Sequence, residues 1–379
     1  MKPLRHWLRP ALALGAALAL GGCSLWSGPS KPQPKELGPN VVLLPVRQAW
    51  TSQLGPIQGM ELSVLVRGNS VTLASAGGEV AQIDARTGAD NWRTRLATPL
   101  SAGVGSDGRW SAVVSRANQL IVLEAGRELW RQPLAAQAFT APLVAGNRVF
   151  VLGADRAVSA YDAATGVRLW SQQRPGEPLI LRHGGVLMAV GNTLVAGLSG
   201  RLVGFNPDNG AILWEAPLAS PRGTNDVERL VEILGGTSRE GASVCARAFQ
   251  ASVGCVDTAR GAVVWSRPAS GSQGIAGDDS MLYGVESNGT VLAWKRADGT
   301  PVWTTDRLQH RRLSTPLLLG RSVVIGDGEG QVHLLAREDG APLNRFTTDG
   351  SAIAAAPVTA GNTLIVVTAK GGVYGFRPD

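Results

Sequence analysis

The sequence VSAYDAATGVRLW, residues 158–170, is the clearest copy of a short pattern that recurs along the chain. It predicts a β-hairpin with an apolar strand up to Tyr161, a turn from Asp162 to Gly166, and a return strand that contains Trp170. An Asp at the start of such a turn accepts hydrogen bonds from the amides that follow it, and a Gly at its end adopts a positive φ. The spacing of Asp, Gly and Trp therefore defines a repeated unit.

Further copies keep this spacing with substitutions, and each is preceded by a second hairpin pattern. In the second pattern, a strand that often begins with Pro, a turn such as Gly146-Asn147 and an apolar strand follow one another. The other copies begin at Asp84, Glu124, Asn206, Asp257, Lys295 and Ala336. Each unit thus has four short strands over roughly 40–50 residues, which is typical of one blade of a β-propeller.

The two ends of the chain each carry part of a unit. The last copy stops at Arg377 before its Trp strand, and residues 46–50 supply an isolated Trp strand near the N-terminus. Pairing these ends completes an eighth blade and leaves no open sheet edge. We therefore expect residues 41–379 to form an all-β, eight-bladed propeller of four-stranded antiparallel blades, closed by the N- and C-terminal strands.

Repeated tryptophans suit packing between neighbouring blades, because the ring is large and its N–H can donate a hydrogen bond. We expect a structural role for all seven that belong to the repeat. They are Trp50, Trp92, Trp130, Trp170, Trp214, Trp265 and Trp303.

The first 40 residues have a different composition. Residues 1–22 combine basic residues with an apolar stretch too short to span a bilayer, as in a signal peptide. They end in Leu-Gly-Gly before Cys23, which resembles the bacterial lipobox, in which the Cys is lipidated. Residues 23–40 are rich in Pro and Gly and predict a flexible tether. Ser24 after the Cys is similar to lipoproteins sorted to the outer membrane, so we expect lipid anchoring on its periplasmic side.

The charge of the chain gives little indication of a partner. The formal net charge is +7 and falls to +4 (7 − 3) when the three basic residues of the signal peptide are removed. A net positive charge is common in proteins that bind nucleic acid, but an exported protein does not routinely encounter nucleic acid. We therefore interpret the charge as solubility and expect no nucleic-acid partner.

The repeat is similar to the blade repeat of quinoprotein dehydrogenases, which bind pyrroloquinoline quinone. Together with the lipobox, the tether and the eight units, the chain resembles the BamB family, lipoproteins of the complex that assembles outer-membrane β-barrel proteins. The segment Leu-Ile-Leu-Arg at residues 179–182 and the segment around His310-Arg311 resemble two loops of that family. Residues 223–234 match a third segment, where Glu232 keeps one acid and Leu234 replaces a second.

This resemblance implies a non-enzymatic scaffold that docks on BamA, the barrel-inserting subunit, through the periplasmic POTRA domains of BamA. The resemblance does not decide whether the protein also contacts unfolded barrel precursors. The residues that the resemblance implies for BamA binding are Leu179, Leu181, Arg182, Glu232, His310 and Arg311.

The first four of these residues lie in two unusually long connections between consecutive blades. We expect the two connections to lie side by side on one face, with the His310 connection on that same face. Asn225 to Glu228 resembles a capping box that opens a short helix. An alternative is that Leu179 and Leu181 belong to the first strand of the next blade.

Two other functional classes stay open. The dehydrogenases that share the repeat carry an adjacent cysteine pair and acidic metal ligands, whereas Cys23, Cys245 and Cys255 are all apart. The sequence also has no Gly-x-Ser-x-Gly and no His-Glu-x-x-His motif. We therefore expect no catalytic residue, metal or cofactor. A propeller that binds a sugar or a peptide is the other alternative, because its central channel has no assigned ligand.

The two later cysteines suggest a disulfide. Aligning the repeats at their Asp position places Cys245 and Cys255 where Phe150 and Ala160 stand in the clearest copy, on adjacent antiparallel strands. Directly opposed residues there have Cα atoms about 4.5–5.5 Å apart, a separation that a disulfide accepts. Exported proteins meet an oxidising compartment. Two small buried thiols are the alternative.

Overall fold

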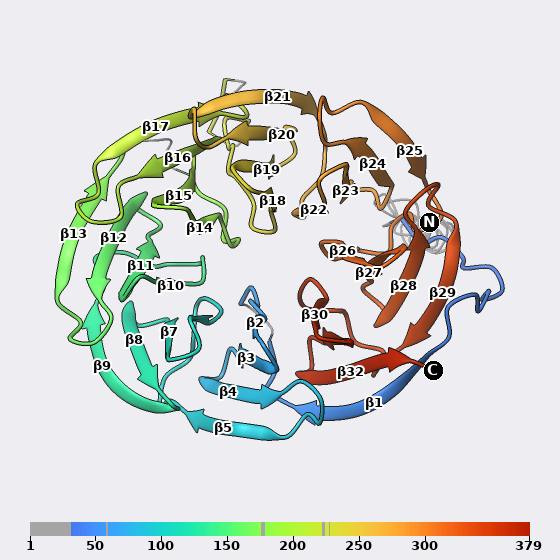
Figure 1. Cartoon of the computed structure of the whole chain (residues 1–379), viewed down its shortest axis with the longest axis horizontal. Helices are drawn as coiled ribbons and strands as arrows, with labels where there is room; N and C mark the ends of the chain where they lie inside the picture. The colour runs from blue at the N-terminus through green and yellow to red at the C-terminus, as the bar shows by residue number, and fades with distance from the viewer. Residues whose placement is uncertain (1–31, 58–59, 176–178, 222–223, 227) are drawn as a thin grey trace, which may run out of the picture. The chain divides into compact units, whose positions relative to one another are not determined.

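The computed structural model describes residues 32–57, 60–175, 179–221, 224–226 and 228–379. The predicted signal peptide and Cys23 lie outside the described residues. The chain divides into the units Met1–Pro34 and Lys35–Asp379, and the second contains the fold. Its described residues form eight four-stranded antiparallel sheets, the blades of a ring (Figure 1). The expected eight-bladed propeller is confirmed.

Regular structure in the described residues is entirely β. Blades 1 to 4 contain, from inner to outer strand, β2 (Leu65–Arg67), β3 (Ser70–Ala74), β4 (Glu79–Asp84) and β5 (Asp90–Arg95); β6 (Gly105–Ser106), β7 (Trp110–Val114), β8 (Gln119–Glu124) and β9 (Arg127–Pro133); β10 (Leu143–Ala145), β11 (Arg148–Leu152), β12 (Ala157–Asp162) and β13 (Arg168–Gln173); and β14 (Leu187–Val190), β15 (Thr193–Leu198), β16 (Arg201–Phe205) and β17 (Ile212–Pro217). The part of the chain described here has no helix of the length and apolar character needed to cross a membrane.

The remaining blades follow the same order, except that the last one takes its outer strand from the start of the chain. Blades 5 to 8 contain β18 (Ser238–Glu240), β19 (Ser243–Ala248), β20 (Ser252–Asp257) and β21 (Ala262–Pro268); β22 (Ile275–Gly277), β23 (Met281–Val285), β24 (Val291–Lys295) and β25 (Pro301–Thr305); β26 (Leu317–Leu319), β27 (Ser322–Gly326), β28 (Gln331–Ala336) and β29 (Pro342–Thr347); and β30 (Val358–Ala360), β31 (Thr363–Val367), β32 (Gly372–Pro378) and β1 (Val46–Gln53).

Blade 8 closes the ring as the repeat predicts. Strand β1 runs antiparallel to β32, with Val46 opposite Pro378 and Gln53 opposite Gly372. Both strands lie side by side next to the C-terminus (Figure 1). The N-terminal strand therefore occupies what would otherwise be an open edge of the last blade.

The hydrophobic core lies between the blades. Each of eight buried clusters joins residues from two neighbouring blades. Successive residues of a strand point to opposite faces of its sheet, so the middle strands contribute to two clusters at once. In β27, for example, Val323 packs towards blade 6 and Val324 towards blade 8. This explains why these strands carry apolar residues on both faces at most of their positions.

Each repeat tryptophan lies against the turn of the next blade. The Trp130 ring covers Gly166, and its Nε1 donates a 2.8 Å hydrogen bond to the carbonyl of Ala163. Gly166 has a φ of 75°, and a Cβ there would lie 2.7 Å from the ring. The equivalent pairs are Trp50–Gly88, Trp92–Gly126, Trp170–Gly210, Trp214–Gly261, Trp265–Gly299 and Trp303–Gly340.

Blade 7 departs from this rule because the turn that would receive its tryptophan does not exist. That turn would join β32 to β1, which are the two ends of the folded chain. Asn344 replaces the tryptophan and donates a 2.7 Å hydrogen bond to the carbonyl of Leu44. The amide of Leu43 donates to the carbonyl of Leu343 at 2.8 Å. The segment before β1 therefore covers the outer strand of blade 7.

Residues 35–40, the end of the predicted tether, are also held against blades 6 and 7. The Lys35 amide donates to the Gln309 carbonyl at 2.9 Å, and its Nζ lies 2.9 Å from Asp306. Asn40 donates to the carbonyl of Arg345 at 2.8 Å. This part of the expected tether is fixed in place because its polar groups find partners on the propeller.

The two later cysteines lie in blade 5. Cys245 on β19 is directly opposite Cys255 on β20, and the two are joined by a disulfide. Both side chains are buried in the core between blades 5 and 6.

Candidate partner-binding surface

The connections between blades all lie on one side of the ring. Strands alternate in direction within a blade, so each connection from an outer strand to the next inner strand lies beside the turn between second and third strands. We call this side the crossover face. Its two longest connections are residues 174–186, between β13 and β14, and residues 218–237, between β17 and β18.

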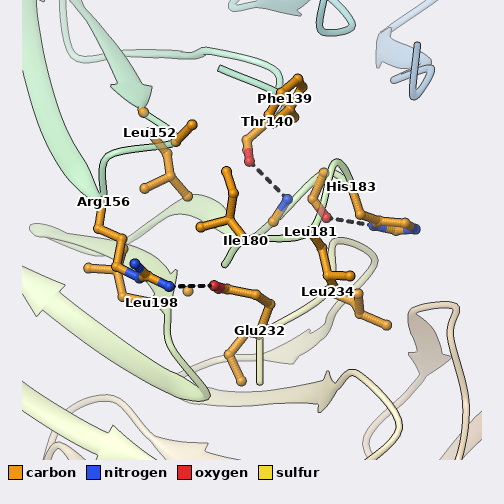
Figure 2. A pocket seen from close by; sticks show the side chains of 16 residues that line it. Phe139, Thr140, Leu152, Arg156, Ile180, Leu181, His183, Leu198, Glu232 and Leu234 are labelled. Atoms are coloured by element: carbon orange, nitrogen blue, oxygen red, sulfur yellow. Dashed lines mark hydrogen bonds and ion pairs between the residues drawn. The ribbon is translucent and has the colours of Figure 1, made fainter. Parts of the chain in front are cut away.

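These two connections lie side by side, as expected. Gly185 forms an isolated antiparallel bridge with Leu234, and the Gly235 amide donates to the Gly184 carbonyl at 2.8 Å. Together they surround a small cavity lined by Leu181, Leu198, Ile180 and Leu234 (Figure 2).

The described residues 224–226, 228 and 229 form bends and turns, and Leu230 has no regular structure, so the expected short helix is wrong for these residues. The capping contact itself is present, because the Glu228 amide donates to the Asn225 side chain at 2.9 Å. One backbone bond of helical spacing follows, from Arg229 to Asn225 at 3.1 Å. The segment then continues towards β18 without a second turn of helix.

The structure brings Leu179, Leu181 and Arg182 to the crossover face. Strand β14 begins only at Leu187, so the alternative that the two leucines belong to the inner strand is wrong. Leu179 is 40% exposed, whereas Leu181 lines the cavity. Arg182 is exposed and its guanidinium lies 5.3 Å from the centre of the Phe139 ring.

Arg156, which sequence reasoning missed, ties the two connections together. It lies in the turn between β11 and β12, is buried, and donates to the carbonyl of Leu179 at 3.0 Å. It also pairs with Glu232 at 3.3 Å (Figure 2). Its Nε donates to the hydroxyl of Ser199 at 2.8 Å. No motif marks Arg156, because its partners are far from it in the sequence.

This pairing changes the role expected for Glu232. Burial raises the pKa of Glu232, while Arg156 and the Ser199 amide act in the opposite direction. The carboxylate therefore faces Arg156 inside the molecule. Glu232 supports the loop that carries Leu179 and is not an exposed contact at the edge of the surface.

The structure also corrects the expectation for Arg311. Arg311 is 4% exposed and donates to the Asp327 carboxylate at 2.8 Å. It also pairs with Glu329 and donates to the carbonyl of Lys35 at 3.0 Å. Its guanidinium is thus occupied inside blade 7 and is not available for a partner. His310, by contrast, is exposed on the crossover face.

Asp327 is the centre of this buried group. His333 Nε2 lies 3.0 Å from the same carboxylate that Arg311 contacts. Burial favours a higher pKa for Asp327, but hydrogen bonds from His333, the Gln331 amide and Arg311 lower the pKa to about 2. The group is a structural ion-pair network below the connection that contains His310.

A channel of about 890 Å³ runs between the inner strands and the connections. Its lining includes the cationic Arg67, Arg182 and Arg312. Glu61 is the one carboxylate among the described lining residues, and His183 Nδ1 lies 3.0 Å from it. Burial raises the pKa of Glu61, and His183 and the Gly184 amide act in the opposite direction.

Comparison with known proteins decides which family this arrangement represents. The family model described as outer membrane protein assembly factor BamB matches residues 76–305 and 307–379. A curated protein of that name from Burkholderia pseudomallei (strain K96243) is 39% identical over 381 residues, which cover 100% of both chains. The chain belongs to the BamB family.

Solved structures extend this comparison to the fold. The crystal structure of BamB from Moraxella catarrhalis has a TM-score of 0.79 at 22% identity, covering 88% of this chain and 99% of that one. A quinohemoprotein alcohol dehydrogenase from Comamonas testosteroni has a TM-score of 0.66 at 16% identity, covering 88% and 76%. The BamB family thus shares its propeller with these dehydrogenases.

The channel of this BamB-family chain does not fit a quinone cofactor with acidic metal ligands. Glu61, its one described carboxylate, is engaged by His183 and the Gly184 amide. The described residues contain no group of three His, Cys, Asp or Glu side chains that could hold a metal ion.

Proposed function

We propose that this protein is a non-enzymatic assembly factor for outer-membrane β-barrel proteins and that it docks on BamA through BamA's periplasmic POTRA domains. The printed names of its relatives, outer membrane protein assembly factors, support the first part. The observation that carries the second is the exposed pair Leu179 and Arg182 on the connection 174–186, which Arg156 ties to the neighbouring connection through Glu232.

The docking surface consists of Leu179, Leu181 and Arg182. An apolar side chain beside an arginine is the combination that is common in the energetically dominant part of protein interfaces. Arg182 has no carboxylate partner among the described residues. Its guanidinium lies over the Phe139 ring, and this contact leaves the N–H groups of Arg182 free to bind a carboxylate of a partner. A guanidinium can bind a carboxylate of a partner through two parallel hydrogen bonds.

Binding to the purified periplasmic domains of BamA, measured by calorimetry, tests this surface. Arg182→Glu and the pair Leu179→Ala/Leu181→Ala should each weaken binding by about 2 kcal/mol or more, roughly 30-fold. The matched control is Arg127→Glu, an exposed arginine on the outer strand of blade 2, which should bind normally. The proposed face is wrong if Arg182→Glu melts like the wild type and keeps its full affinity for BamA.

The anchor is a separate part of the proposal. Two or more acyl chains on Cys23 would hold the protein stably on the periplasmic side of the outer membrane. Cys23→Ser should move the protein from the outer-membrane fraction to the soluble periplasmic fraction. An unchanged distribution would argue against lipidation at this residue.

The shared fold makes a quinone-dependent dehydrogenase the second candidate function. Titration of the purified protein with pyrroloquinoline quinone and calcium, followed by a dye-reduction assay, separates the two. The assembly factor should neither bind the cofactor tightly nor reduce the dye. Tight binding with dye reduction would favour the enzyme.

A further inference from the structure

The outer wall of the propeller has grooves between neighbouring blades, and one of them already holds a peptide segment of this chain. Groove 6–7, between blades 6 and 7, is lined by residues 35–41 together with His333, Leu335 and Pro342. The segment has no regular secondary structure, and its Leu37 packs against the core between these blades. Hydrogen bonds at Lys35 and Asn40 fix its two ends.

Groove 5–6, between blades 5 and 6, is built from the corresponding positions of the repeat. Its wall contains Leu292 and Trp294 on β24, which correspond to His333 and Leu335 on β28. Pro301 starts its outer strand as Pro342 starts that of blade 7. The same backbone framework therefore forms both grooves.

The two grooves differ in what lines them, because residues 35–41 form one side of groove 6–7, which measures about 620 Å³. Groove 5–6 measures about 790 Å³, and the described residues that line it all come from blades 5 and 6. Leu292 and Pro301 are partly or largely exposed there, while Trp294 forms the floor. The lining also includes polar residues such as Arg267 and Glu286, and a groove that combines an aromatic ring with prolines is the kind of surface that binds extended proline-containing peptides.

The floor of groove 5–6 is held rigid from inside. Arg247 is completely buried, pairs with Glu286 at 3.0 Å, and lies 5.8 Å from the Trp294 ring centre. Glu286 also accepts a 2.6 Å hydrogen bond from the Ser270 hydroxyl. Glu286 and Trp294 both line the groove, and Arg247 contacts both of them. Because these side chains are already fixed, a peptide that binds there loses little entropy in ordering them.

We propose that groove 5–6 binds an extended, proline-containing segment of a partner protein, with one apolar side chain seated between Leu292 and Pro301. The bound segment runs as residues 35–41 run in groove 6–7. Proline favours this mode, because it pre-forms an extended backbone and reduces the entropy lost on binding. The site is separate from the docking surface, because none of Leu179, Leu181 and Arg182 lines groove 5–6.

A peptide with the sequence of residues 32–41, PQPKELGPNV, is the probe, since this segment occupies the equivalent groove. A fluorescent copy measures affinity by anisotropy with the full-length protein, and a copy with a photoreactive leucine at the Leu37 position maps the site by mass spectrometry. We expect labelling near Leu292 and Pro301. Labelling confined to groove 6–7 would mean that the peptide only displaces the chain's own segment, which overturns the proposal.

Two variants in the groove and one outside it complete the test. Leu292→Glu and the exposed Pro301→Glu should each weaken peptide binding at least tenfold, whereas Leu213→Glu on the outer strand of blade 4 should not. Circular-dichroism melts identify a variant that fails to fold. BamA binding should be unchanged in both groove variants. Normal peptide affinity in folded Pro301→Glu, or equal binding of a peptide with glycine in place of its prolines, contradicts the proposal.

Discussion

Gly210 shows how the absence of one side-chain atom allows two blades to pack. Its φ is 75°, and a Cβ there would lie 2.6 Å from the Trp170 ring of the preceding blade. Trp170 also donates a 2.9 Å hydrogen bond to the carbonyl of Pro207 in the same turn. A larger residue at this position would strain the turn and push the tryptophan away from it.

We therefore expect Gly210→Ala to lower the free energy of unfolding by about 2–4 kcal/mol, from backbone strain together with the displaced ring. Gly191→Ala is the control within the same blade, because its φ is 55° and nothing lies within 4 Å of its missing Cβ. That change should cost only about 1 kcal/mol. Urea denaturation measures both, and equal losses would show that the tryptophan contact adds nothing.

Asp327 gives a prediction about pH. Its pKa is lowered from 3.8 to about 2, so its contribution to stability is present above the unfolded value and is lost as the pH falls towards 2. Asp327→Asn should cost about 3 kcal/mol or more at pH 7, because the buried Arg311 keeps only the half-exposed Glu329 as a carboxylate partner. Of this deficit, about 2 kcal/mol should disappear between pH 4 and pH 2. Urea denaturation across this range measures it, and a deficit independent of pH would contradict the assignment.

At the scale of single elements, blade 5 is the one blade whose middle strands are joined covalently within the described chain. The disulfide between Cys245 and Cys255 connects β19 and β20, which already share a ladder of backbone hydrogen bonds. Its closed loop is short, with a sequence separation of 10 residues. The disulfide should therefore add a moderate amount to the free energy of unfolding, mainly because it restricts the unfolded chain.

Replacing both cysteines by alanine should lower the free energy of unfolding by about 2–3 kcal/mol. Alkylation without reductant, followed by mass spectrometry, checks the bond directly in protein from an oxidising compartment. The expected result is no labelling at Cys245 and Cys255 until a reductant is added. Two labelled thiols before reduction would contradict the disulfide.

For the molecule as a whole, stability depends on how the ring closes. Strand β1 brings Trp50 onto Gly88 of blade 1 and pairs along β32. Residues 35–40 add contacts on blades 6 and 7 but belong to no blade. The two segments should therefore differ sharply in what their removal costs.

Chains that begin at Lys35, Val41 and Gly55 separate these contributions. The chain that begins at Lys35 should melt like the longest form, and the one that begins at Val41 a few degrees lower. The chain that begins at Gly55 loses β1 and should lose about 5 kcal/mol or more, most of the net stability of a domain. Thermal melts compare the three. Equal melting temperatures for the last two would argue against closure through β1.

Blade number, strand order and closure were all predictable because each repeat carries its own local instructions. Turn residues, apolar strands and a tryptophan recur in most copies, so a copy that lacks one of them can still be placed by the spacing of the others. The opposed positions of Cys245 and Cys255 followed from the same alignment. Leu179 and Arg182 could be placed on a connection because they fall between two clear units.

Other features depend on contacts that occur once and join residues far apart in the sequence. Arg156 reaches Glu232 across two blades, Arg311 is enclosed by Asp327 and Lys35, and Leu37 enters a groove of blades 6 and 7. A single long side chain has the same local sequence whether it lies in solvent or in a buried ion pair. Only the folded ring decides between these, because burial and partner come from the packing of blades.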